Sequence, residues 1–497
     1  MVSGRVAAQD SAASRLPCTC VAQFDDLVQR VKADYIGYRF ALAARSRDSI
    51  AQMTALLRER ANRTPNDSCV FALRAFTQWF RDGHLFVVEA PQIADSTVQQ
   101  LTASAATIAR SEADIRRDLA RRASHLDPIE GIWYAEDGYR VGIIPDPRPQ
   151  RHGFVAIVLS TTVAGWAPGQ VKGEFVKRLD GSYTATLYID NHSVRHPEGD
   201  IYRGVHSGVK IYKGLLLRMS PREWGKEYPI HRWDRGILNS RNPRAPTLLV
   251  RDNQTVVVSV PSHDGQYKAA LDSLISAHRA DILAADNLII DLRGDEGGNE
   301  PTTASLEPFI TSKVQRPPLA WEDDVPVVLS SPTNIAYFTL MEKDGWIPAH
   351  LTERMQLHPG AIVPFPDTLD NDTTRGTPAA ADTAYQRPRR VAILIDRAVV
   401  SAGEAFILRV RRRAKVTLFG EPTAGVIDFQ DVQLTDLRCA AGGLLVGYPM
   451  VAGSSLLPRG GLNNVGIPPD VPIAASVGDQ VGFIEDYYHR HRSLRSH

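Results

Sequence analysis

The stretch Val391-Ala-Ile-Leu-Ile-Asp-Arg-Ala-Val-Val-Ser401-Ala-Gly-Glu-Ala-Phe406 decides the fold class of this chain. Its apolar first part predicts a buried strand, and a short turn leads from the strand to Ser401 at the mouth of a helix. A serine there lies at the positive end of the helix dipole, beside free N–H groups that could hold an oxyanion. Ser401 with Glu404 three positions later is also a structural capping box, and the segment alone leaves both interpretations open.

A second stretch, Leu288-Ile-Ile-Asp-Leu-Arg-Gly-Asp-Glu-Gly-Gly298, again joins an apolar strand to a turn. Its paired glycines, Gly297 and Gly298, let backbone N–H groups converge on an anion because no Cβ blocks the approach. Taken alone, the segment favours a plain turn between a strand and a helix. Asp291 and Arg293 are predicted to be structural, tying the strand to its neighbours.

A third stretch, Trp79-Phe-Arg-Asp-Gly-His84-Leu-Phe-Val-Val88, places a histidine in a turn between a helix and a strand-like run. The chain has 14 histidines, so a lone one carries little weight. His84 gains a role only if the fold brings it to Ser401.

Around the first two stretches, buried strands alternate with helices, which is the pattern of an α/β fold. The predicted strands are Thr255–Val260, Asn287–Leu292, Val391–Asp396 and Val416–Phe419, and the predicted helices are Tyr267–Ala284, Ala304–Ser312 and Gly403–Arg413. The region from Pro317 to Pro388 is rich in proline, aspartate and threonine and is predicted to be an inserted loop or lid.

The rest of the chain shows two other patterns of hydrophobic residues. Apolar residues recur at helical spacing from Val21 onward, with a long exposed helix predicted over Leu101–Leu126, and short alternating runs follow from Ile129 to Leu248. The predicted organisation is a leader or signal remnant (1–20), a helical domain (21–126), a β-rich module (127–248), an α/β core (249–480) with an insert (317–388), and a tail (481–497).

Composition excludes several classes of protein. The 497 residues correspond to roughly three domains, and 43% hydrophobic with 23% charged residues is the ordinary globular range. With 57 basic and 56 acidic residues the net charge is +1, which argues against nucleic acid or an anionic membrane as partner. No apolar run approaches the ~20 residues that span a bilayer.

The four cysteines are too few for a disulfide framework, and their spacing does not suit zinc. A bridge from Cys18 or Cys20 to Cys69 stays open, as does the state of Cys439. The N-terminus lacks the apolar core of a signal peptide, yet Val6-Ala7-Ala8 resembles the end of one. We therefore expect an exported protein, periplasmic or extracellular, with a cytoplasmic one as the alternative.

Together these segments resemble the tail-specific (C-terminal-processing) serine peptidase family. IDLRGDEGG (290–298) is similar to the family's Asp-Leu-Arg-x-Asn-x-Gly-Gly motif, and SAGEAF (401–406) to its nucleophile segment. TLFGEPTAG (417–425) and VGIPPDVPI (465–473) match its later motifs, in the family's order. The resemblance implies an α/β core of the ClpP/crotonase-like type, here with an N-terminal helical domain and a β-rich middle domain.

The departures from the family pattern point to one branch. Bacterial processing members use a serine–lysine dyad, but Val426 occupies the lysine position and Lys415 does not match it. The usual PDZ module is also missing, and the β-rich stretch takes its place. The chain is therefore closer to the tricorn-like branch, in which a histidine from the N-terminal region is the base, and His84 matches that position.

The resemblance implies a role for each of the following residues. Ser401 is the nucleophile and His84 the general base, with the N–H of Ala402 and one from Gly297 or Gly298 as the oxyanion hole. A serine hydroxyl needs such a base, and imidazole with a pKa near ~6.5 suits the task. Gly83 and Asn463 stand where the branch has its orienting serine and acid, so Asp82, Glu421 and Asn463 are the candidates for orienting His84.

The predicted function is a serine peptidase that hydrolyses unfolded tails or short peptides through an acyl-enzyme, without a metal or organic cofactor. Its partner is a peptide or unfolded protein, and its oligomeric state stays open. One alternative is a non-catalytic binding relative of the same fold, since the lysine and the relay acid are missing. A crotonase-like acyl-CoA enzyme would explain Gly297 and Gly298 but gives no role to Ser401 or His84.

Overall fold

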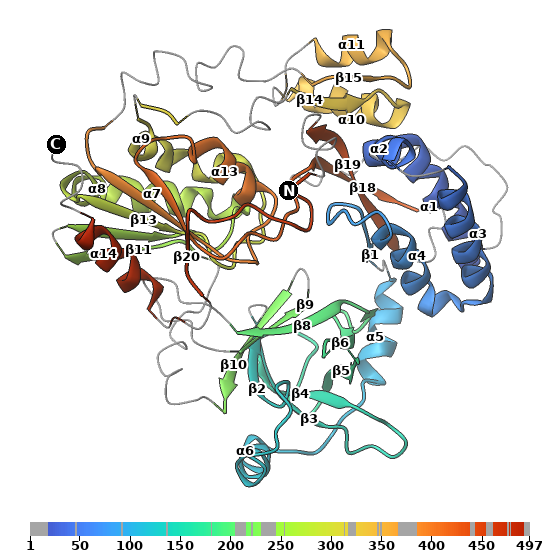
Figure 1. Cartoon of the computed structure of the whole chain (residues 1–497). Coiled ribbons are helices and arrows are strands. Elements are labelled where there is room, and N and C mark those ends of the chain that lie inside the picture. Colours follow the sequence, from blue (N-terminus) through green and yellow to red (C-terminus); the bar gives the residue numbers. More distant parts are fainter. Residues whose placement is uncertain are drawn as a thin grey trace. The chain divides into compact units, whose positions relative to one another are not determined.

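The computed structural model forms two compact units, which are described separately here (Figure 1). The core unit comprises Met1–Val88 and Arg244–His497, and the inserted unit comprises Glu89–Pro243. The structure describes residues 18–491 except 45–46, 91–92, 136–137, 180, 204–214, 220–221, 230–244, 253, 313, 317–324, 345–346, 348–349, 366–384, 438–442, 454–460, 475–476 and 478.

A six-stranded sheet forms the centre of the core unit, in the order β11-β12-β13-β16-β17-β20. All of its pairs are parallel except β11–β12. Its strands are β11 (Thr247–Asp252), β12 (Thr255–Ser259), β13 (Asn287–Asp291), β16 (Arg390–Ile395), β17 (Val416–Gly420) and β20 (Val471–Pro472). Four of them are the strands that the apolar runs predicted. Every residue of β12 and β13 is buried, as expected for parallel strands covered on both faces.

Helices cover both faces of this sheet (Figure 1). Those on one face are α7 (Lys268–Ala277), α8 (Arg279–Ala284), η4 (Glu300–Leu306), α9 (Glu307–Ile310) and α13 (Ala402–Val410). The other face packs against α14 (Gln480–Arg490) through Val481, Ile484 and Tyr488. The segment predicted to be a C-terminal tail is therefore, over its described residues, a helix that completes the core.

A second sheet of the core unit joins distant parts of the sequence. Its order is β1-β19-β14-β15, with β18 also paired to β19. These strands are β1 (Phe86–Glu89), β14 (Pro326–Leu329), β15 (Ile362–Pro364), β18 (Phe429–Asp436) and β19 (Leu444–Gly453). Four N-terminal helices share one hydrophobic core with this sheet: α1 (Cys20–Asp34), α2 (Ile36–Ala44), α3 (Arg47–Arg63) and α4 (Cys69–Gln78). The short η1 (Asn66–Ser68) precedes α4 and has no buried residue.

The region predicted to be a loop or lid over 317–388 is, where the structure describes it, regular secondary structure. It holds β14, β15, α10 (Pro332–Lys343) and α11 (Leu351–Leu357). Phe338, Leu351 and Met355 are buried in the core shared with the N-terminal helices. The prediction was wrong for these residues because the threonine and aspartate of this region are concentrated in 366–384, which lie outside the described residues, while most of its prolines lie elsewhere.

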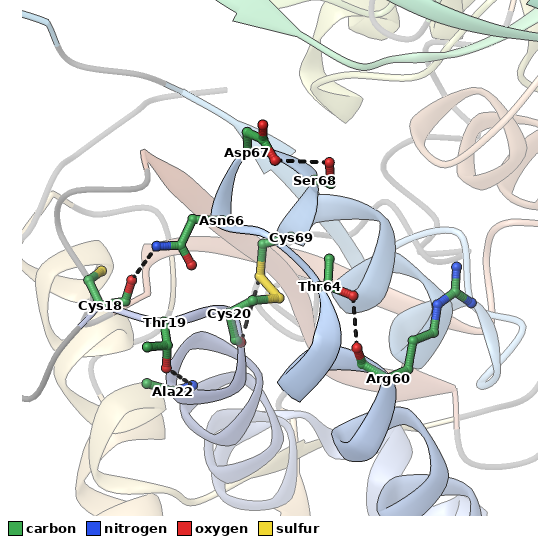
Figure 2. The surroundings of a disulfide bond; sticks show 10 residues. All are labelled: Cys18, Thr19, Cys20, Ala22, Arg60, Thr64, Asn66, Asp67, Ser68 and Cys69. Atoms are coloured by element: carbon green, nitrogen blue, oxygen red, sulfur yellow. Dashed lines mark hydrogen bonds between the residues drawn. A yellow bond between two sulfur atoms is a disulfide. The ribbon is translucent and has the colours of Figure 1, made fainter.

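A disulfide between Cys20 and Cys69 joins the first residues of α1 and α4 (Figure 2). Next to it, the Asn66 side chain donates a hydrogen bond to the Cys18 carbonyl, which ties the start of α1 to η1. The structure thus chooses between the two bridges that the sequence left open. Cys439 lies outside the described residues.

The inserted unit is built on a nine-stranded antiparallel sheet, in the order β5-β4-β3-β2-β10-β9-β8-β6-β7. An additional pairing of β5 with β6 closes the sheet into a ring. The strands are β2 (Gly131–Ala135), β3 (Tyr139–Pro145), β4 (Phe154–Thr161), β5 (Val171–Lys177), β6 (Tyr183–Tyr188), β7 (Val194–Arg195), β8 (Glu198–Arg203), β9 (Leu215–Met219) and β10 (Arg222–Tyr228). Trp133, Phe175 and Trp224 belong to its own hydrophobic core.

Two short helices of this unit, α5 (Asp95–Ala103) and α6 (Glu112–Arg121), replace the long connecting helix predicted over Leu101–Leu126. The helix is interrupted because Ala106 and Ile108 hydrogen-bond with Val171 and Gly169, beside β5. The compact unit therefore begins at Glu89, well before the residue 127 at which the β-rich module was predicted to start. No described helix of either unit has the length and apolar character needed to cross a membrane.

Candidate active site

Ser401 lies in a sharp turn between β16 and α13, at the N-cap of the helix. Its backbone is in the left-handed region, with φ 53° and ψ −118°, which non-glycine residues rarely adopt. Such strain costs on the order of 1–3 kcal/mol and recurs where a side chain must be presented for function. The prediction of a serine at the mouth of a helix is confirmed.

The carboxylate of Glu404 connects this turn to a second one. One of its oxygens, Oε2, accepts the N–H groups of Ser401 (3.2 Å) and Val426 (2.7 Å). The other oxygen accepts the N–H of Gly425 (2.9 Å) and the Thr423 hydroxyl. Glu404 is completely buried, and burial raises the pKa of its carboxyl group. The predicted capping contact from Glu404 to the Ser401 backbone thus belongs to a larger clamp.

The glycine loop after β13 lies directly against Ser401. A Cβ added to Gly297 would lie 2.9 Å from Ser401 Cβ and from the Val400 carbonyl oxygen, so only glycine allows this approach. Gly297 and Gly298 both have positive φ, 79° and 140°. The fold therefore brings together two segments that the sequence identified separately: the one with the paired glycines and the one with Ser401.

The backbone N–H groups of this loop differ in their hydrogen bonds. The Gly297 N–H donates to Asp295 Oδ1 at 3.0 Å. The N–H groups of Gly298 and Ala402 have no acceptor among the described residues, and Gly298 is exposed. Of the two glycines that the sequence left open, Gly298 is thus the one whose N–H is available to a ligand.

The imidazole ring of His84 is buried, and its Nδ1 lies 2.5 Å from the carbonyl oxygen of Phe429, the first residue of β18. A carbonyl oxygen only accepts hydrogen bonds, so Nδ1 carries the proton and Nε2 keeps its lone pair. Burial lowers the pKa of His84 to about 4, although the Phe429 carbonyl opposes the shift. The ring is therefore uncharged at neutral pH.

The turn that carries His84 packs against the segment that Glu404 ties to Ser401. A Cβ on Gly83 would lie 2.8 Å from Val426 Cγ1, and the side chain of Asn464 donates to the Arg81 carbonyl at 2.8 Å. Val426 in turn donates its N–H to Glu404. A chain of direct contacts thus leads from the histidine turn to the N-terminus of α13, which is distant from it in the sequence.

Asp82, predicted as a candidate for orienting His84, contacts the backbone of that residue. Its Oδ1 accepts the His84 N–H at 2.9 Å, and its Oδ2 accepts the Tyr35 hydroxyl at 2.8 Å. Burial raises the pKa of Asp82 to about 7. The carboxyl group therefore shapes the turn, while the ring donates its hydrogen bond to the Phe429 carbonyl.

The other two candidates for orienting His84 have different contacts. Glu421 Oε1 lies 3.9 Å from Arg397 Nε. Asn463 Oδ1 accepts the N–H groups of Ile427 (3.0 Å) and Asp428 (3.2 Å), and so supports the chain just before Phe429. Among the described contacts, none joins either side chain to the His84 ring.

Neither lysine position places an amine beside Ser401. Val426 is apolar and packs on Gly83. Lys415 immediately precedes β17, at the edge of the parallel sheet opposite to the one where β16 leads to Ser401. Its ammonium group contacts the carbonyls of Tyr385 and Pro388, and burial lowers its pKa to about 8.

Asp291 and Arg293 have the structural role predicted for them. They form a buried ion pair, and Arg293 also reaches Gln480 at the start of α14 (3.0 Å). Sequence reasoning missed two contacts that shape the site, the Phe429 carbonyl and the wider Glu404 clamp. A backbone carbonyl leaves no signal in the sequence, whereas the SAGEAF motif did contain Glu404. Among the described residues, no group of three or more His, Cys, Asp and Glu side chains could hold a metal ion.

Residues 348–473 match the model of peptidase family S41, and this confirms the resemblance to the tail-specific serine peptidases. The matched region includes Ser401, the Glu404 clamp and Phe429; it ends short of His84 and Gly298 on the N-terminal side. No curated protein matches the sequence.

Three solved structures match most of the chain, each at low identity and a low TM-score. One is mature CPAF complexed with lactacystin, 12% identical over 96% of this chain and 98% of that chain, with a TM-score of 0.41. Another is the photosystem II D1 C-terminal processing protease, 14% identical over 94% and 96% of the two chains, with a TM-score of 0.37. A third is a lipoprotein from Streptococcus agalactiae, 11% identical over 96% and 100%, with a TM-score of 0.38.

Proposed function

Starting from the membership of residues 348–473 in peptidase family S41, we propose that the protein is a serine peptidase of the tricorn-like branch. Ser401 is the nucleophile and His84 the general base of this proposal. The substrate is an unfolded tail or a short peptide, and the reaction proceeds through an acyl-enzyme.

The observation that carries the proposal is the strained turn at Ser401, next to two backbone N–H groups without a partner in the described structure. A left-handed serine at a helix N-terminus, facing Gly297 across a contact that only glycine permits, has no structural purpose that a relaxed capping residue would not serve better. The N–H groups of Ala402 and Gly298 supply the donors that a tetrahedral oxyanion requires.

In the proposed reaction, Ser401 Oγ attacks the carbonyl carbon of the scissile peptide bond while Nε2 of His84 accepts the hydroxyl proton. The negative charge on the carbonyl oxygen is stabilised by Ala402 and Gly298. The imidazolium then gives its proton to the leaving amine. Water hydrolyses the ester of Ser401 by the reverse sequence, with His84 again as base.

The hydrogen bond from His84 Nδ1 to the Phe429 carbonyl supports this role. It selects the tautomer with a free Nε2 and lets a neutral acceptor, instead of a carboxylate, stabilise the imidazolium. The acid relay of the branch has no counterpart in these contacts, so the base operates with weaker support.

That weaker support favours one alternative, a binding protein of the same fold that does not hydrolyse its ligand. In that case the buried, uncharged His84 is a structural residue and the Gly298 and Ala402 N–H groups hold a carboxylate or carbonyl of the ligand. A crotonase-like acyl-CoA enzyme is less well supported, because it leaves the strain at Ser401 without a use.

A fluorophosphonate probe separates these possibilities, because it reacts covalently only with an activated serine. We expect the folded protein to be labelled at Ser401, located by peptide mass spectrometry, and the rate to fall by about 10²–10⁴ in His84→Ala. The matched control is His278→Ala, which removes an exposed histidine of the same unit and should leave the rate unchanged. A folded wild-type protein that resists the probe would exclude the peptidase and leave the binding alternative.

A further inference from the structure

A second histidine of the core unit, His263, lies behind the glycine loop and has no part in the proposed reaction. It follows β12, is completely buried, and its Nδ1 forms a hydrogen-bonded pair with Asp295 Oδ2, which is also completely buried. A carboxylate removed from water needs such a donor, because an uncompensated buried charge is very costly. The His263 ring therefore stabilises the buried Asp295 carboxylate and holds it in position.

Asp295 is connected both to the glycine loop and to the turn that leads to Ser401. Its Oδ1 accepts the N–H groups of Gly297 (3.0 Å) and His263 (3.1 Å). Its own carbonyl accepts the N–H of Val400 at 3.1 Å. A Cβ on Gly403 would lie 2.5 Å from Asp295 Oδ2, so the carboxylate also touches the first turn of α13. One side chain thus contacts Gly297 and Gly403, the neighbours of the two proposed oxyanion-hole donors Gly298 and Ala402.

The backbone of His263 holds the other side of the loop. Its N–H donates to the Gly297 carbonyl (3.1 Å), and its carbonyl accepts the N–H of Asn299 (2.7 Å). Gly298 lies between these two hydrogen bonds, and a Cβ there would come within 2.4 Å of the His263 carbonyl carbon and oxygen. Because the Gly297 N–H already donates to Asp295, the N–H of Gly298 is the donor that stays available to a ligand.

The ring of His263 provides more than packing. Its Nε2 is buried without a hydrogen-bond partner among the described residues, which costs about 1–3 kcal/mol. Leucine or phenylalanine would fill the space next to Phe406 without that penalty. Leucine and phenylalanine would, however, lack the N–H that His263 directs at Asp295.

We propose that His263 and Asp295 are a positioning pair for the oxyanion hole, which orients the Gly297–Gly298 loop so that the N–H of Gly298 faces the substrate carbonyl at Ser401. This inference rests on the proposed peptidase function. The pair acts through the loop and does not touch the reacting atoms.

The test compares two replacements of His263 in the full-length protein. His263→Leu removes the donor to Asp295, whereas His263→Asn keeps an N–H at the position of Nδ1. We expect the rate of fluorophosphonate labelling, and kcat for a peptide substrate, to fall about 10- to 100-fold in His263→Leu. His263→Asn should stay within about threefold of the wild type, and KM should be unchanged in both variants.

The matched control is His278→Leu. It breaks an exposed pair of the same kind, with His278 Nδ1 2.8 Å from Asp281 Oδ2, and should change neither kcat nor the labelling rate. Equal losses in His263→Leu and His263→Asn, or a wild-type rate in His263→Leu, would overturn the proposal. If His263→Leu does not fold, Asp295→Ala and Asp295→Asn replace it. The asparagine, which still accepts from Gly297, should retain at least about tenfold more activity than the alanine; equal activities would contradict the pair.

Hydrogen exchange of the peptide covering 291–300 gives a second readout that does not depend on catalysis. We expect its amides to exchange at least about fivefold faster in His263→Leu than in His263→Asn. If the wild type is not labelled at Ser401, the peptidase function fails while faster exchange still supports the positioning of the loop. Equal exchange in the two variants would overturn the positioning itself.

Discussion

The strength of His84 as the proposed base is set by its surroundings, since burial lowers its pKa to about 4 while the Phe429 carbonyl keeps Nε2 unprotonated. A base works only in its deprotonated form, so kcat/KM should fall as the pH drops through this pKa. We expect the acid limb of the pH profile near pH 4 instead of near ~6.5, the usual value for histidine.

The measurement is kcat/KM, or the labelling rate, between pH 3.5 and 8, with circular dichroism at each pH to show that the protein stays folded. An acid limb near ~6.5 in folded protein would mean that the ring is solvated in the active state. The same depressed pKa predicts a loss of stability as the pH falls from ~6.5 toward 4, because the unfolded chain binds the proton first.

Glu404 is the residue on which both turns of the site depend. Glu404→Ala leaves three buried N–H groups without their acceptor, so we expect a loss of about 2–4 kcal/mol in the free energy of unfolding and at least a tenfold slower labelling of Ser401. Denaturant unfolding and the probe measure the two effects.

The control for this change is Glu421→Ala, since Glu421 is half-buried and faces the exposed Arg397. We expect it to alter stability by less than about 1 kcal/mol. A Glu404→Ala protein as stable and reactive as this control would show that the clamp is dispensable.

At the level of single residues, the sequence predicts side chains better than it predicts their partners. Ser401 and the paired glycines can be identified from the sequence, because a helix N-terminus and a positive φ each favour particular residue types. The acceptor for His84 is a carbonyl in β18, which any residue could provide, so no pattern identifies it. Asp82 and Asn463, both predicted near His84, hold backbone N–H groups: Asp82 that of His84 itself, and Asn463 that of Ile427, two residues before Phe429.

At the level of elements, apolar runs correctly predicted the parallel strands because these strands are buried on both faces. Composition was a poorer guide. It concealed α10 and α11 within a segment rich in proline, aspartate and threonine, and a polar, arginine-rich stretch suggested one long exposed helix over Leu101–Leu126 where α5 and α6 are separate. Both errors arise where tertiary hydrogen bonds and burial override the average of a window.

The disulfide between Cys20 and Cys69 is expected to stabilise the N-terminal helices through the 49 positions that it spans. Closing a loop of this size in the unfolded chain is worth about 3–4 kcal/mol in the chain-entropy model. Replacing both cysteines with serine should therefore lower the Tm by several degrees.

Labelling at Ser401 measures the consequence for the site, because α4 leads directly into the turn of His84. We expect the double serine variant to lose labelling at a lower temperature than the wild type, with the same rate at 25 °C. Identical melting curves for the two proteins would show that packing alone secures these helices.

At the level of the whole molecule, the inserted unit has the features of an independent domain. Its sheet closes on itself through β5 and β6, and Trp133 and Trp224 are buried in its own core. We expect residues 89–243, expressed alone, to give a β-type circular dichroism spectrum, blue-shifted tryptophan fluorescence and one cooperative thermal transition. A fragment with unfolded-type fluorescence would show that the unit needs the rest of the chain.

The position of this unit in the sequence also has a consequence in time. It separates Met1–Val88 from Arg244–His497, although these two stretches form one core unit. A ribosome therefore completes the histidine turn long before it makes Ser401, or β18 with the carbonyl that holds the histidine ring. In the proposed peptidase, the nascent chain therefore contains the general base before it contains the nucleophile. The protein cannot cleave other chains near the ribosome until its last third has been synthesised.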